Sequence, residues 1–360
     1  MSDKNLMVHP VEVQDTTRFF DVRQAPFRIY GLYNAQNEPF FKRMPSALAE
    51  QVSDGIAVHH RHTAGGRARF ATDSPYLHIK VKVNHVCRFS HMPLTGSAGF
   101  DLYEDSASQK SSRFVGTFVP PHELQENGTW EAKLTFRDKK QRFLTVNFPS
   151  YCGVDELLIG LEQGCTLQAG LPYSNRLPIV YYGSSITQGG CSSHPGNSYQ
   201  NMVSRVFNAD YINYGFSGHC LAEDNMVEYL AEQQMSVFVC DYDHNAPNAE
   251  YLQRTHAKVY ERIRAKHPDV PFIMLSRPDF NPHDEQCKLR RDVVIDTFRK
   301  ARKRGDQNVY YIDGEGLFRG EFGDCCTVEG CHPNDLGFSK MADSIICTLR
   351  DILVKTNIFE

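Results

Sequence analysis

One short stretch decides the fold: Leu177-Pro178-Ile179-Val180-Tyr181-Tyr182-Gly183-Ser184-Ser185-Ile186-Thr187-Gln188-Gly189-Gly190. Its apolar run over 179–182 is β-branched and aromatic without polar alternation, which is typical of a strand buried on both faces in a parallel sheet. The run stops at a glycine that is followed by two serines. Because ligands of open α/β sheets bind beyond the carboxyl ends of the strands, Ser185 or Ser184 is a candidate nucleophile.

After Pro172, strand-like runs alternate with helix-length segments. Five such β/α units predict an α/β domain with a flavodoxin-like, doubly wound parallel sheet of five strands. Helices are expected over 249–266, where apolar residues recur on one stripe, and over 339–355, which closes the domain. The predicted strands are 179–182, 211–214, 236–241, 271–275 and 308–312.

The chain before Pro172 has a different pattern. Short runs such as 76–83 alternate polar and apolar residues, are joined by turn-like segments, and predict half-buried antiparallel sheet. We expect an all-β, jelly-roll-like sandwich with one short helix over 46–52. The predicted domains are therefore residues 1–172 and residues 173–360, joined by a linker too short and too poor in glycine and serine for a detached module.

Composition narrows the possible partners. The 360 residues carry a net charge of −4 with both signs interspersed, so no basic surface for nucleic acid or for a membrane is expected. Residues 1–20 lack the apolar core of a signal peptide, and no later run approaches the roughly 18 apolar residues of a membrane span. These patterns predict a cytoplasmic protein whose partner is a small molecule or a neutral polymer.

The sequence contains two sets of potential metal ligands. One set is Cys325, Cys326 and Cys331, and the other is His59, His60 and His62. The cysteine spacing fits no common zinc pattern, and on a strand only the second and third histidines of the other set would share a face. The eleven scattered cysteines suit reduced, packed thiols. The sequence therefore predicts no metal and no cofactor.

Polar residues gather where the predicted strands end, and parallel strands bring these loops to one crevice. The first loop holds Ser184 and Ser185, and the later loops contain Ser217-Gly218-His219, Asp243-His244-Asn245 and Glu329-Gly330-Cys331-His332-Pro333. Acyl transfer needs a nucleophile, a base, a group that orients the base, and donors for the developing oxyanion. Each requirement has a candidate among these residues.

In these motifs the chain resembles the SGNH hydrolases, also called GDSL esterases and lipases. The first family block matches Gly183-Ser184-Ser185-Ile186-Thr187 and implies Ser185 as the nucleophile, with Ser184 in the usual aspartate position. The later blocks imply Gly218, Asn245 and His332, with Glu329 in place of an aspartate. The phrase His91-Met92-Pro93-Leu94-Thr95-Gly96 further resembles a subgroup that carries a β-sandwich before the hydrolase domain.

The resemblance implies a serine esterase that removes a short acyl group, expected to be acetyl, from a carbohydrate or a related small molecule. His332 would be the base, and the backbone of Ser185 and Gly218 with the Asn245 amide would form the oxyanion hole. Glu329 is the group expected to orient His332, with Asp324 or a backbone carbonyl as the alternatives. Substrate-lining roles are expected for His244, Asp243 and Ser184, and Asp335 is expected at a helix terminus.

Two other functions remain open at this point. An acyltransferase would use the same acyl-enzyme and pass the acyl group to an alcohol instead of water. A non-catalytic carbohydrate-binding protein would have the altered blocks, at Ser184, Asp243 and Glu329, as marks of a decayed site.

Overall fold

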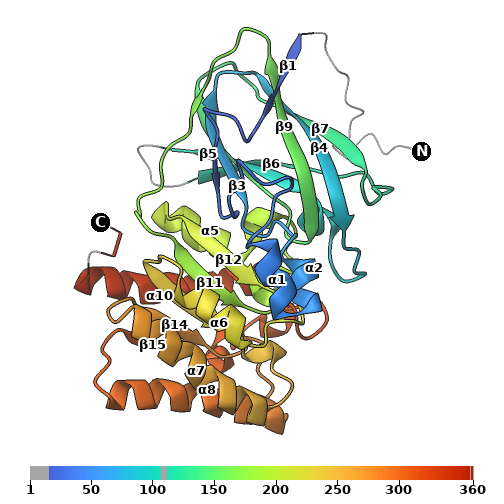
Figure 1. The fold of residues 1–360 in the computed structure, drawn as a ribbon. Coiled ribbons are helices and arrows are strands. Elements are labelled where there is room, and N and C mark those ends of the chain that lie inside the picture. The colour runs from blue at the N-terminus through green and yellow to red at the C-terminus, as the bar shows by residue number, and fades with distance from the viewer. Residues whose placement is uncertain (1–15, 107–111, 357, 360) are drawn as a thin grey trace.

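A β-sandwich lies against an α/β domain in the computed structural model, which describes residues 16–106, 112–356, 358 and 359 (Figure 1). The sandwich consists of two antiparallel sheets, one ordered β1-β9-β4-β7 and the other β10-β3-β8-β5-β6 with β2 paired to β3. The strands of the first sheet are β1 (Thr17–Asp21), β4 (Tyr76–Val86), β7 (Thr129–Thr135) and β9 (Cys152–Glu162). Those of the second are β2 (Arg28–Tyr30), β3 (Arg67–Thr72), β5 (Phe100–Asp105), β6 (Ser112–Phe118), β8 (Arg142–Asn147) and β10 (Leu167–Ala169).

The third sheet, in the α/β domain, is parallel and ordered β12-β11-β13-β14-β15, which confirms the predicted flavodoxin-like arrangement. Its strands are β11 (Ile179–Gly183), β12 (Tyr211–Gly215), β13 (Val237–Asp241), β14 (Phe272–Leu275) and β15 (Val309–Ile312). The helices and turns around it are α4 (Ser185–Gln188), η1 (Pro195–Asn197), α5 (Tyr199–Phe207), α6 (Asp224–Ala231), η2 (Asp243–Asn245), α7 (Ala249–Lys266), α8 (Glu285–Lys303), α9 (Gly314–Leu317), η3 (Gly323–Cys325) and α10 (Asp335–Lys355).

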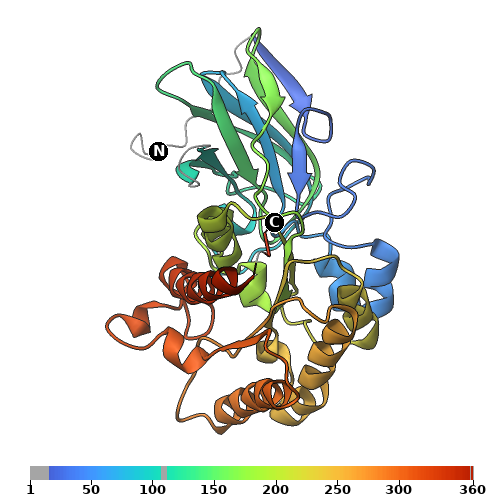
Figure 2. The same cartoon turned by 90° about the vertical axis from the view of Figure 1, so that its left-hand side faces the viewer.

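Both faces of the parallel sheet are covered, which explains why its strands read as unbroken apolar runs. Successive residues of β11 alternate between the two cores: Val180 and Tyr182 pack with α6, α7 and α8, whereas Ile179 and Tyr181 pack with α5 and α10. Figure 2 shows these two helical layers on opposite sides of the strands.

The amino-terminal part of the chain also enters the α/β domain. Helix α1 (Ser46–Val52), which was predicted, is followed by α2 (Asp54–His59), and α1 contacts both α2 and α6 (Figure 1). Met44, Ala49 and Ile56 are fully buried in the same core as Val180. The proposed boundary between residues 172 and 173 lies in the linker between β10 and β11, yet the α/β core includes residues from both sides of it.

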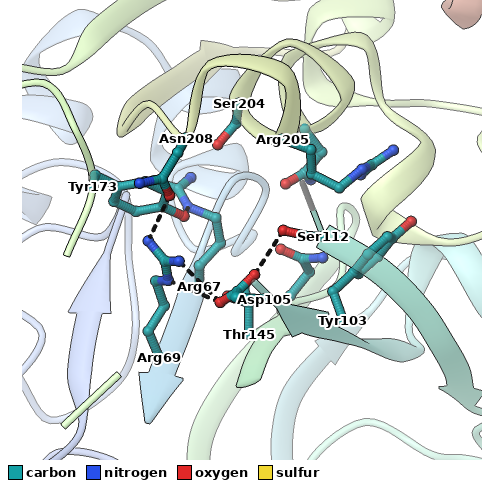
Figure 3. Close-up of a pocket in the computed structure, with 12 residues that line it drawn as sticks. Arg67, Arg69, Tyr103, Asp105, Ser112, Thr145, Tyr173, Ser204, Arg205 and Asn208 are labelled. Atoms are coloured by element: carbon teal, nitrogen blue, oxygen red, sulfur yellow. Dashed lines mark hydrogen bonds and ion pairs between the residues drawn. The ribbon is translucent and has the colours of Figure 1, made fainter. Parts of the chain in front are cut away.

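Buried arginines join the two domains. Arg67 donates to the Tyr173 hydroxyl at 2.9 Å and pairs with Asp210, and Arg69 donates to Asp105 at 2.9 Å and to Asn208 at 3.3 Å. Figure 3 shows Arg67, Arg69 and Tyr173 beside a cavity between the sandwich and α5. The volume of this cavity is about 20 Å³. A buried charged group is strongly destabilising when it loses its partner, so these contacts fix the two domains against each other.

The prediction that His59, His60 and His62 lie on a strand is wrong. The first ends helix α2, the second caps it, and the third follows in an isolated bridge to Gly153. All three are buried, with relative exposures of 9%, 3% and 0%. The Ser53 side chain caps α2 by accepting from the Ile56 backbone N–H at 3.3 Å, and this cap favours the helix over a strand.

All eleven cysteines are free thiols, as the sequence predicts. Among the described residues, no helix is both long enough and apolar enough to cross a membrane. The prediction that the chain lacks a signal peptide concerns residues 1–20, of which 1–15 lie outside the described residues, and the cytoplasmic location stays a prediction.

Candidate active site

Ser185 lies at a sharp turn from strand to helix. Strand β11 ends at Gly183, Ser184 is the N-cap of α4, and Ser185 is the first residue of that helix. The Ser184 hydroxyl accepts from the Ile186 backbone N–H at 3.1 Å, so this side chain supplies a cap. A Cβ at Gly183 would lie 2.1 Å from Thr187 Oγ1 and 2.4 Å from the Asp241 carbonyl oxygen, so only glycine fits the turn.

His332 approaches Ser185 from the loop between β15 and α10. Its Nε2 lies 2.8 Å from Ser185 Oγ, within hydrogen-bonding distance of a hydroxyl that would lose its proton. The loop is held by the bridge between Thr327 and Pro333 and by Asn334, whose side chain caps α10. The backbone therefore presents the imidazole to the end of β11.

Glu329 contacts the other side of the same imidazole. Its carboxylate oxygens lie 3.0 and 3.2 Å from His332 Nδ1, and Oε1 also accepts from the His332 backbone N–H at 2.5 Å. Burial raises the pKa of Glu329, but hydrogen bonds from His332 outweigh it, and the pKa falls below its ordinary value. Asp324 is exposed, and within the described part of the chain it makes no hydrogen bond to the imidazole.

Burial lowers the pKa of His332, but contacts with Cys331 and Glu329 outweigh it and raise the pKa above its ordinary value. An anionic neighbour stabilises the imidazolium, which is the form that a general base takes after it accepts a proton.

The three groups expected in the oxyanion hole lie beyond neighbouring strand ends. In the sheet register Gly183 pairs with Gly215 on one side and with Asp241 on the other, so the loops that hold Gly218 and Asn245 begin level with the nucleophile turn. Gly218 has a φ of +71°, and a Cβ there would meet open space. Asn245 Oδ1 accepts from the Cys220 backbone N–H at 3.3 Å, which leaves its NH2 end as the donor.

Gln188 fixes the loop that carries Gly218. This side chain is 1% exposed, and its Oε1 accepts from the Ser217 backbone N–H at 3.0 Å. Its Nε2 donates to the Ser150 carbonyl at 3.1 Å and lies 3.0 Å from His62 Nδ1. One buried amide thus connects the glycine loop with the sandwich domain, a role that no local sequence motif signals.

His244 belongs to a charged cluster behind His332. Its Nε2 lies 3.3 Å from Asp279 Oδ2 and 3.4 Å from Cys331 Sγ, and Asp279 also pairs with Arg277. Burial lowers the pKa of His244, but Asp279 and Cys331 outweigh it and raise the pKa to about 10. Burial raises the pKa of Cys331, yet hydrogen bonds with His244 and His332 bring it down to about 7.

Asp243 and Ser184, also expected near the substrate, are both fully buried. Asp243 Oδ2 accepts from the Arg277 backbone N–H at 3.0 Å, so this carboxylate supports the loop after β14. Asp335 begins α10, as predicted, and accepts from Ser193 and Asn197.

The sandwich domain contributes side chains that sequence reasoning missed. The His91 ring lies 5.1 Å from the His332 ring between centroids, and the Tyr151 hydroxyl donates to the Ser185 carbonyl at 3.2 Å. A groove of about 610 Å³ opens beside them, lined by Ser90, His91, Met92, Pro93, Cys191, Ser193, Val328, Asn334, Asp335 and Leu336. Both domains therefore border the candidate site.

Potential metal-ligand atoms also cluster around His332, but hydrogen bonds already occupy several of them. The three groups are His91/Cys191/His332, His244/Asp279/Cys331 and Glu329/Cys331/His332. Each group contains a residue that already makes one of the hydrogen bonds described above, either His332 with Ser185 and Glu329 or His244 with Asp279.

Two family descriptions match this chain. Residues 176–350 match the GDSL-like lipase/acylhydrolase family, and residues 17–167 match the N-terminus of SGNH-hydro-type esterases. No curated protein matches the sequence.

Several solved structures share the whole fold. A GDSL-like lipase from Bacteroides ovatus is 25% identical, with a TM-score of 0.83 over 94% of this chain and 98% of its own. The salicylyl-acyltransferase SsfX3, from a tetracycline biosynthetic pathway, is 19% identical with a TM-score of 0.74 over 95% and 99%. A family two carbohydrate esterase from Cellvibrio japonicus is 11% identical with a TM-score of 0.62 over 96% and 99%. The chain belongs to the GDSL-like lipase/acylhydrolase family and is an SGNH-type esterase with an N-terminal β-sandwich.

Proposed function

We propose that the protein hydrolyses short acyl esters, with acetyl as the expected group, of a carbohydrate or a related small molecule. The observation that carries this proposal is the 2.8 Å contact between Ser185 Oγ and His332 Nε2. Glu329 is the proposed third member, because its carboxylate faces the opposite nitrogen of the imidazole.

In this mechanism Ser185 Oγ attacks the ester carbonyl while His332 Nε2 takes the hydroxyl proton. The negative charge that develops on the carbonyl oxygen is stabilised by the backbone N–H groups of Ser185 and Gly218 and by the Asn245 amide. His332 then returns the proton to the leaving alcohol, and an acyl-enzyme remains on Ser185. Water, deprotonated by the same imidazole, releases the acid and restores the hydroxyl.

Three further residues receive supporting roles in this proposal. Ser184 caps α4 and thereby sets the position of Ser185. Asp243 holds the loop after β14 through the Arg277 backbone. His244, paired with Asp279, supplies positive charge behind the catalytic loop instead of a surface for the substrate.

The groove of about 610 Å³ beside His91 is the proposed place for the substrate, a small acyl group on a larger alcohol. Its lining includes the apolar side chains Met92, Pro93, Val328 and Leu336 next to polar ones. The carbohydrate esterase named above has the same two-domain fold, which supports a sugar as the alcohol.

Acyl transfer to an alcohol is the second candidate. The salicylyl-acyltransferase SsfX3 shares the fold over 95% of this chain, and an acyl-enzyme on Ser185 would serve either reaction. Product analysis with an added acceptor alcohol separates the two: an ester product identifies a transferase, and free acid alone identifies a hydrolase.

A pair of serine variants tests the nucleophile. Ser185→Ala is expected to lower kcat for an acetyl ester by about 10⁴-fold or more and to abolish labelling by an organophosphorus ester. Ser184→Ala loses a cap worth about 1 kcal/mol and is expected to keep labelling and much of the activity. Equal losses in both variants, or full activity of Ser185→Ala, would refute the assignment.

A further inference from the structure

Three side chains outside the proposed triad converge in the sandwich domain. His62 Nε2 lies 3.0 Å from His85 Nδ1, and Cys87 Sγ lies 3.7 Å from the first nitrogen and 3.8 Å from the second. Strand pairing explains why these three side chains lie close together. Gly153 of β9 pairs with both His62 and His85, and Cys87 is two residues beyond His85 on the same face of the strand path.

These three distances lie within about 0.4 Å of the ligand–ligand distances around a tetrahedral zinc ion. Zinc bonds of about 2.0–2.1 Å to nitrogen and about 2.3 Å to sulfur place two nitrogens about 3.3–3.4 Å apart, and nitrogen and sulfur about 3.6 Å apart. The observed edges are 3.0, 3.7 and 3.8 Å, so small side-chain shifts bring all three atoms to bonding distance. We propose that His62, His85 and Cys87 form a zinc site in the sandwich domain.

The donor set favours zinc over the hard cations. Two imidazoles and one thiolate are the ligands that zinc takes, whereas calcium and magnesium bind oxygen ligands. This proposal differs from the sequence-based prediction of no metal. His85 and Cys87 lie 23 and 25 residues after His62, and this separation does not correspond to a common zinc-binding motif.

Other side chains lie near the outer nitrogens of the two histidines. His85 Nε2, the nitrogen that faces away from the cluster, lies 3.7 Å from Glu126 Oε1. His62 Nδ1, also facing away, lies 3.2 Å from His59 Nδ1. Ligating histidines generally place their second nitrogen against a carboxylate or another acceptor, which orients the ring.

Metal binding requires a rearrangement of protons. Gln188 donates to His62 Nδ1, so in the metal-free protein the ring proton is on Nε2. Zinc on Nε2 moves that proton to Nδ1, where His59 Nδ1 accepts it, and the Cys87 thiol proton is released to solvent. Gln188 then loses one acceptor but keeps the Ser150 carbonyl.

The site has an open side. His62 is fully buried, but the His85 side chain is 31% exposed and Cys87 is half-buried. A metal ion therefore reaches the cluster from solvent, and water completes the fourth position.

Cobalt and zinc binding to the full chain, freed of metal with a chelator, test the proposal. Cobalt is expected to bind with a stoichiometry of one and to give the near-ultraviolet charge-transfer band of a thiolate ligand, and zinc is expected to displace it. Cys87→Ser should lose the band and bind zinc more than about 100-fold more weakly, because loss of a group that only orients a ligand already costs about 10- to 100-fold.

Two matched cysteine variants serve as controls. Cys165→Ser changes a free thiol elsewhere in the sandwich, and Cys331→Ser removes the thiol shared by the clusters at the active site. Both should keep the band. A band that is missing from the unaltered protein, or lost in Cys331→Ser and kept in Cys87→Ser, overturns the proposal.

A further variant covers the case in which Cys87→Ser does not fold. His85→Gln retains the thiolate and removes one nitrogen, and circular dichroism verifies its fold. It should also weaken zinc binding by more than about 100-fold. Unchanged affinity in a folded His85→Gln protein overturns the proposal as well.

Discussion

Glu329→Gln is the substitution that most directly tests how His332 is held. The glutamate accepts from His332 Nδ1 at 3.0 Å and from the His332 backbone N–H at 2.5 Å. A glutamine of the same length keeps one of these contacts but removes the negative charge. The change therefore separates the electrostatic role of the carboxylate from its shape.

The expected magnitude follows from the charge pair that forms in the transition state. Two unit charges about 4 Å apart attract by about 1 kcal/mol in water and about 4 kcal/mol at an effective dielectric constant of 20. The His332 side chain is 19% exposed and the Glu329 side chain 36%, so solvent screens part of the interaction, and about 2–4 kcal/mol is expected. That loss lowers kcat by about 30- to 1,000-fold.

The KM for a small acetyl ester should change little, because the imidazolium exists only after proton transfer. The pH dependence carries a second signature. The carboxylate stabilises protonated His332, so its removal lowers the pKa of that imidazole. The acidic limb of the kcat profile therefore moves to lower pH in Glu329→Gln.

Steady-state kinetics from pH 5 to 9 measure both effects. Asp324→Asn is the matched control, because Asp324 is exposed near the same loop without contacting the imidazole. Asp335→Asn is a second control and should lower thermal stability more than kcat, since Asp335 accepts from Ser193 and Asn197. Near-normal kcat in Glu329→Gln together with a large loss in Asp324→Asn would refute the proposed triad.

Three further predictions concern the supports of the site. Gln188→Ala leaves the Ser217 N–H without its acceptor. A loss of about 1–3 kcal/mol should lower kcat by about 5- to 160-fold with little change in KM, and an equal rise in KM would indicate a binding role instead. Cys331→Ser removes an anion beside His332, so the acidic limb of the kcat–pH profile should move to lower pH. In the unaltered protein, iodoacetamide should react with Cys331 at a rate that rises through about pH 7, because the pKa of this thiol is about 7. Residues 175–360 expressed alone should be insoluble or much less active, because the α/β core includes Met44; a stable fragment with full activity would contradict the docked arrangement.

Local pattern determined the architecture and the order of the catalytic loops. Unbroken apolar runs signal strands covered on both faces, alternating runs signal half-buried strands, and both signals depend only on neighbouring residues. Because parallel strands end at a common edge, the same pattern also predicted that Ser185, Gly218, Asn245 and His332 belong to one crevice. The contact between Glu329 and the imidazole was less predictable, since one methylene changes where the carboxylate lies.

Tertiary structure alone decided which distant side chains support that crevice. His91, Tyr151 and Gln188 act across the domain interface, and no spacing along the chain records such contacts. The prediction of a strand at residues 59–62 is wrong, because the Ser53 cap favours a helix that ends at His59. His62 and His85 meet because both pair with Gly153, and strand pairing of this kind is set by long-range register, which a local reading of sequence does not contain.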